Sequence, residues 1–170
     1  MNRKRFLHNM TAGLGGLAIF GGIARGQSST MADPEPYPID LVKNFVIAGH
    51  GDFPKVRSMV QEYPNLIYSK FDWGNGDFEA AIEGAGHVGN QEIASYLIDE
   101  GSRVTLFVLT MLGKTDLVKP ILDAYPKLVF AYGPHGFTLL HHAKMGGVAA
   151  QPLYNYLQEK GLKETWVKIK

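Results

Sequence analysis

The chain has 170 residues, 45% of them hydrophobic and 19% charged, a composition typical of one globular domain and not of a disordered chain. Cysteine is absent, which excludes disulfides, thiolate metal sites and a cysteine nucleophile. Four of the 17 basic residues and none of the 16 acidic ones precede Gln27, so the rest of the chain is net negative and lacks the basic surface expected of a nucleic-acid-binding protein.

Residues 1–26 have the three-part layout of a secretory signal. A basic start is followed by a mildly apolar, glycine-rich stretch that is too short to span a bilayer, and then by a small-residue cleavage motif at Ala24 and Gly26. We therefore predict a removable targeting segment and no stable membrane anchor. A flexible basic tail on a cytoplasmic protein is the alternative.

The start of this segment resembles the twin-arginine export motif, through Arg3, Lys4, Phe6 and Leu7, with Lys4 in place of the second arginine. The resemblance implies export to the periplasm by the twin-arginine route, and general secretion stays open as the other route. Residues 27–38 are rich in serine, proline and acidic side chains and are predicted to be a linker. The predicted domain covers residues 39–165, followed by a polar tail at residues 166–170.

Four glycines set the internal periodicity of the domain: Gly51, Gly89, Gly113 and Gly147. After each of the first three, apolar residues recur at offsets of roughly four, five, eight and nine, which is the pattern of one face of a helix. A shorter apolar segment precedes each glycine. The sequence thus predicts an all-α fold of about four helix-turn-helix units.

The segment from Gly136 to Ala143 resembles the ankyrin-repeat signature Thr-Pro-Leu-His-x-Ala, with Thr138 and His141 in register and Leu139 in place of proline. The stretch from Gly89 to Ser102 is similar to the second helix and ending of that repeat. The resemblance covers residues 40 to about 162. It implies an ankyrin-repeat solenoid that binds a protein partner through its finger loops and concave helical face.

The spacings between the four glycines are 38, 24 and 34 residues, so the middle connection is truncated. Two long connections remain: the first long loop (Tyr63–Glu79) and the second long loop (Tyr125–Phe137). They begin alike, with Tyr-Pro-Asn-Leu-Ile-Tyr in one and Tyr-Pro-Lys-Leu-Val-Phe in the other. We predict a notch between them.

The predicted partner-binding residues lie on these two loops, because large aromatic side chains supply much of the energy at protein interfaces. They are Tyr68, Phe71, Trp73, Asn75, Asp77, Tyr132 and His135. The leading hypothesis is a non-catalytic protein-interaction module, monomeric by itself. The alternatives are a small ligand bound in the notch and export as a folded complex with the partner.

No catalytic, cofactor or metal site is predicted. His50 and His87 adjoin glycine turns, and the ankyrin resemblance implies that His141 hydrogen-bonds neighbouring loop backbone, so the histidines are assigned structural roles. Asp72 to Asp77 alternates oxygen-bearing residues with glycine, but Gly74 and Gly76 occupy positions where a calcium loop needs ligands. A tight glycine turn is the prediction for that segment, with calcium binding as the alternative.

Overall fold

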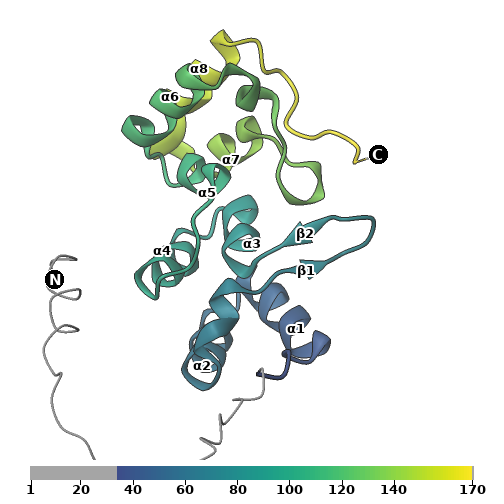
Figure 1. Ribbon diagram of the computed structural model, residues 1–170. Helices are drawn as coiled ribbons and strands as arrows, with labels where there is room; N and C mark the ends of the chain where they lie inside the picture. Colours follow the sequence, from purple (N-terminus) through teal and green to yellow (C-terminus); the bar gives the residue numbers. More distant parts are fainter. Residues whose placement is uncertain (1–33, 170) are drawn as a thin grey trace, which may run out of the picture. The chain divides into compact units, whose positions relative to one another are not determined.

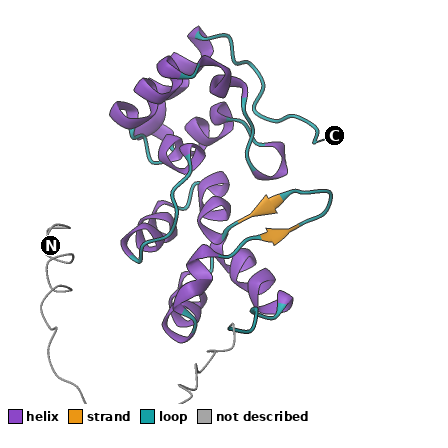
Figure 2. Ribbon diagram, in the orientation of Figure 1, coloured by secondary structure: helices purple, strands orange, loops and turns teal. Residues whose placement is uncertain are grey.

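The computed structural model describes residues 34–169, so the predicted export signal and most of the predicted linker lie outside the described part. Helices dominate the described residues (Figure 2). The eight α-helices are α1 (Ile39–Gly49), α2 (Phe53–Glu62), α3 (Ala81–Val88), α4 (Gln91–Asp99), α5 (Leu106–Met111), α6 (Thr115–Ala124), α7 (Leu139–Met145) and α8 (Gln151–Glu159). A mostly helical fold is therefore confirmed.

Two short antiparallel strands and four short 3-10 helices lie in the connections. Strands β1 (Phe71–Asp72) and β2 (Phe78–Glu79) pair as a hairpin, with Phe71 opposite Glu79. The 3-10 helices are η2 (Pro64–Tyr68), η3 (Pro126–Phe130), η4 (Pro134–Gly136) and η5 (Gly147–Ala150). The hairpin belongs to the first long loop, and η4 belongs to the second.

Local capping explains where several helices begin. The Asp52 side chain accepts from the Lys55 amide (3.1 Å) at the start of α2, and Asn90 accepts from the Ile93 amide (3.0 Å) at the start of α4. At α3 the Glu83 carboxylate accepts from the backbone amide of Ala80 (2.9 Å). These bonds satisfy amides that have no partner within the first helical turn.

The odd-numbered helices pack in chain order, with α1 against α3, α3 against α5 and α5 against α7. Each also packs against the even-numbered helix that follows it, as Figure 1 shows for α7 and α8. Two buried apolar clusters result. One is centred on Phe45, Ile82 and Leu97, and the other on Leu122, Leu140 and Leu157.

Three of the four glycines that set the periodicity have a left-handed backbone: Gly89 (φ 79°), Gly113 (φ 67°) and Gly147 (φ 60°), whereas Gly51 does not. Residues 100–105 join α4 to α5 without a strand or a helix. No helix in the described part of the chain is both long enough and apolar enough to cross a membrane.

Candidate metal centre

Four side chains from separate segments converge beside the hairpin. His50 follows the last residue of α1, Glu79 ends β2, His87 lies in α3 and His135 lies in η4. One ligand-type atom from each lies within 4.8 Å of those of the others. We call these four residues the histidine–glutamate cluster.

Glu79 is the centre of the cluster and is fully buried. Its Oε1 lies 3.4 Å from His50 Nε2 and 3.2 Å from His87 Nδ1. Its Oε2 lies 3.3 Å from His135 Nε2 and accepts a 2.7 Å hydrogen bond from the Trp73 indole. The carboxylate thus faces three imidazoles at once.

Two of the imidazoles are oriented by bonds that point away from the cluster. His50 Nδ1 lies 3.0 Å from the backbone oxygen of Val46, and His135 Nδ1 lies 2.7 Å from the Asp77 carboxylate. An outward Nδ1–H leaves the Nε2 lone pair of each ring directed at the cluster when the ring is neutral. This is the arrangement found behind metal-bound histidines, whose second nitrogen donates to a carboxylate or a carbonyl.

His135 has an unusual backbone conformation, with φ at 59° in the left-handed region. Asp77 holds it there, because Asp77 Oδ1 accepts from the His135 amide (2.8 Å) while Oδ2 contacts the ring. A non-glycine residue in this region is strained and persists only where its surroundings enforce it. One carboxylate therefore fixes both the backbone and the ring of His135.

The buried centre of the cluster contains polar atoms with no hydrogen-bond partner. They are Glu79 Oε1 and His87 Nδ1, which lie 3.2 Å apart without forming a hydrogen bond. Buried polar atoms nearly always have a hydrogen-bond partner, so two neighbouring buried atoms without one require an explanation. A cation between them would satisfy both.

The protonation behaviour follows from burial and the shared carboxylate. Burial lowers the pKa of His87 to about 4, against the opposing charge of Glu79, so this ring is neutral near pH 7. The pKa of His50 is raised, chiefly by its contact with Glu79. Burial by itself would raise the pKa of Glu79, but the contact with His50 and the charges of the three histidines outweigh it and the net pKa is lowered.

Glycine provides the space for one of the rings. A Cβ on Gly84, in α3, would stand 2.8 Å from Cε1 of His50. Two hydrogen bonds hold the rest of the site. Lys70, just before β1, binds Glu83 (2.9 Å), and the Trp166 indole donates to the His135 carbonyl (2.7 Å). The residues at the start of the predicted polar tail thus contact the second long loop.

The donor set fits a divalent ion. Zinc–nitrogen bonds of about 2.0–2.1 Å place tetrahedral donors about 3.3 Å apart. Glu79 Oε1 lies 3.4 Å from His50 Nε2 and 3.2 Å from His87 Nδ1, which matches this value, whereas His135 Nε2 is 3.3 Å from the other oxygen, Oε2. The four ligand atoms lie within 4.8 Å of one another, so an ion would draw the more distant pairs closer together.

Three of the seven predicted partner-binding residues belong to this site or its support: Trp73, Asp77 and His135. Phe71 packs edge-on against Trp73, and Asn75 lies in the hairpin turn with φ at 56°. Tyr68 and Tyr132 are exposed, 44% and 50% respectively, and lie apart from the cluster. The sequence did not indicate that His50, Glu79 and His87 meet His135.

His141 and Thr138 make contacts elsewhere. His141 Nε2 lies 2.8 Å from the backbone oxygen of His87, and its ring stacks on Phe137. The Thr138 hydroxyl donates to the Glu164 carbonyl at 2.6 Å. Both therefore tie α7 to neighbouring segments.

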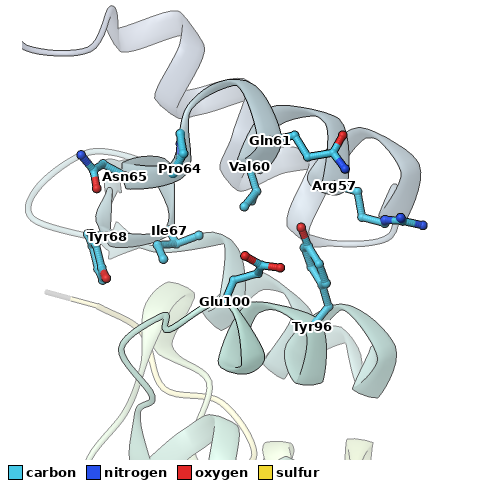
Figure 3. Close-up of a pocket in the computed structure, with 9 residues that line it drawn as sticks. All are labelled: Arg57, Val60, Gln61, Pro64, Asn65, Ile67, Tyr68, Tyr96 and Glu100. Carbon is cyan, nitrogen blue, oxygen red and sulfur yellow. The ribbon is translucent and has the colours of Figure 1, made fainter.

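Larger cavities lie outside the cluster, among them one of about 420 Å³ lined by residues 124–128. Two others adjoin the first long loop. One, of about 410 Å³, has α2 and η2 on one side and α4 on the other (Figure 3). Its lining includes Arg57, Tyr68, Tyr96 and Glu100. The other, of about 480 Å³, lies between the two long loops, with Asn75 and Phe78 on one side and Tyr132 and Pro134 on the other. Neither includes a histidine.

The chain matches no protein-family model, no curated protein and no solved structure.

Proposed function

We propose that this protein binds one divalent transition-metal ion at the histidine–glutamate cluster. The observation that carries the proposal is that two adjacent buried atoms, Glu79 Oε1 and His87 Nδ1, have no hydrogen bond at the point where His50 and His135 also converge. Three imidazoles and one carboxylate suit borderline ions such as zinc, cobalt, nickel and copper. The absence of thiolates and the single carboxylate disfavour soft and hard ions respectively.

The ion would connect segments that are far apart in the sequence. The ligands come from the turn after α1, the first long loop, α3 and the second long loop, so binding joins residue 50 to residue 135. A site assembled only in the folded chain converts binding energy into folding energy. We therefore expect the metal to raise the unfolding temperature of the helical domain, residues 34–169.

The test is metal stoichiometry and affinity on the full chain. Protein stripped with a chelator is titrated with zinc by calorimetry, and the bound metal is measured by elemental analysis. We expect one ion per chain in the wild type and loss of binding in a His50→Gln, His135→Asn double variant. Asparagine suits position 135 because it tolerates the left-handed backbone there.

A His142→Gln variant is the control, because His142 is more deeply buried than the two replaced histidines and bonds to the Thr138 carbonyl, outside the cluster. It should retain one ion per chain. Equal stoichiometry in the double variant and the wild type, or no tight zinc binding in the wild type, would overturn the proposal.

A second function is compatible with the first: an ankyrin-type module that is exported and binds a protein partner through its two long loops. The packing of α1, α3, α5 and α7 in chain order supports the repeat interpretation, and the cavity of about 480 Å³ between the loops supports a binding surface there. Tyr132, half exposed at this cavity, is the residue that tests it. A partner captured by wild type and by Tyr125→Ala, but not by Tyr132→Ala, is the expected result.

A further inference from the structure

The cluster is buried on one side and open on the other. Glu79 is fully buried and His87 is 8% exposed, whereas the His50 and His135 side chains are 31% and 30% exposed. An ion held by all four would therefore be sealed on the Glu79–His87 side. Its other side would face solvent between the rings of His50 and His135.

A cavity of about 300 Å³ lies on that open side, lined by Ile47, His50, Trp73 and His135. This volume is at the lower end of the range for small-ligand sites. Two of the four lining residues are ligands of the proposed ion, and the other two are large apolar side chains. A molecule in the cavity would reach the ion directly.

The apolar walls offer contact and no hydrogen bonds. The Trp73 indole N–H is directed inward at Glu79 Oε2, 2.7 Å away, so the ring presents only carbon to a ligand. Ile47, on α1, is 46% exposed and also lines the cavity. The polar end of an occupant must therefore bind the metal, while its body contacts Ile47 and Trp73.

The charge of the site favours an anion. A divalent ion with Glu79 as its one carboxylate ligand keeps a net positive charge on its coordination sphere, and the Asp77 carboxylate contacts the Nδ1 of His135, the ring nitrogen that does not face the ion. The Lys43 ammonium lies 6.0 Å from the Trp73 ring and adds positive charge near the rim. Four protein donors fill a tetrahedral site, so an incoming carboxylate would bind as a fifth ligand, an expansion of the coordination sphere that zinc accepts.

Resting on the proposed metal function, we infer that the ion has an exchangeable position facing this cavity, which binds a small monocarboxylate with a compact apolar body. The carboxylate coordinates the ion, and the body contacts Ile47 and Trp73. Carboxylates with such a body should bind more tightly than formate.

The test uses full-length protein loaded with cobalt(II), whose visible absorption reports changes in coordination. Sodium formate and sodium benzoate are titrated separately. We expect both to change the spectrum, with benzoate binding about tenfold more tightly because its ring is buried against the two apolar walls. Ile47→Ser should reduce benzoate affinity about threefold and leave formate and cobalt binding unchanged.

Ile39→Ser is the matched control, since Ile39 is an exposed isoleucine of the same helix that does not line the cavity. A cobalt spectrum that neither anion changes would overturn this inference and leave the metal site standing. Equal affinities for formate and benzoate would overturn the apolar part of it. Failure to bind cobalt at all would instead overturn the proposed metal function.

Discussion

The two long loops start with the same backbone and end with different roles. Tyr63 (φ −131°, ψ 75°) and Tyr125 (φ −129°, ψ 72°) each lead into a five-residue 3-10 helix that begins with proline. After it, the first loop forms the hairpin that carries Glu79, and the second makes the short turn that presents His135 (Figure 1). Two loops that begin with the same backbone conformation thus contribute different side chains to the cluster, because only the residues after the shared 3-10 helix reach it.

The largest contrast between the loops should come from one substitution made in each. Gly76 (φ 81°) and Gly136 (φ 80°) have the same positive φ, but a Cβ on Gly76 meets nothing within 4 Å, whereas one on Gly136 collides with the Val167 carbonyl. Gly76→Ala should destabilise the fold by about 1 kcal/mol, from left-handed strain alone. Gly136→Ala should cost roughly 3 kcal/mol or more, because the backbone contact with Val167 must shift as well. Urea unfolding of both variants measures this, and equal costs would contradict it.

The helix after each loop carries a buried histidine whose pKa is lowered to about 4, His87 in α3 and His142 in α7. The unfolded chain binds these protons below pH 6.5 and the folded chain only near pH 4, so stability falls as the pH drops from 6.5 to 4. Glutamine in place of His142 keeps a donor for the Thr138 carbonyl but does not titrate. The variant should therefore lose roughly 3 kcal/mol less unfolding free energy than the wild type when the pH drops from 7 to 4. The measurement is the unfolding free energy of the wild type and of the His142→Gln variant at pH 7 and pH 4. The same pH dependence in both proteins would contradict the prediction.

Asp77, like Glu79, contacts His135 from the other loop, and its neutralisation should weaken the metal centre without removing a ligand. Asp77→Asn keeps the shape of the side chain but weakens its hold on the His135 ring and amide. Loss of such a supporting carboxylate lowers metal affinity by about 10- to 100-fold. Calorimetric titration with zinc provides the measurement. Asp72→Asn, an exposed change in the same hairpin, is the control and should bind as the wild type does.

The smallest effect is expected from the two tryptophans, each of which donates one hydrogen bond near the site. Trp73 bonds to the Glu79 carboxylate, and Trp166 bonds to the His135 carbonyl. Trp73→Phe should lower zinc affinity about fivefold, since it removes a donor that orients the ligand carboxylate. Trp166→Phe should change it less than about twofold. The reverse order of effects would show that the second loop, not the hairpin, determines the geometry of Glu79.

The sequence predicted the helices well because their signals are local. Apolar spacing after Gly51, Gly89 and Gly113 marked α2, α4 and α6, and the truncated connection before α5 followed from the spacing of the glycines. The strand pair was not predicted as such, since two residues per strand carry no periodicity. Export, ankyrin repeats and partner binding remain predictions.

The sequence by itself determined which segments are helical, where the glycine turns interrupt them, and that two loops share a starting pattern, because each of these depends on residues within a few positions of one another. The tertiary structure alone decided that His50, Glu79, His87 and His135 meet, because they are separated by up to 85 positions and none belongs to a spacing motif for metal ligands. Without this convergence, none of the four residues could share a metal ion with the others. Packing of α1 against α3, and the Asp77 clamp on His135, bring them within reach of a single ion.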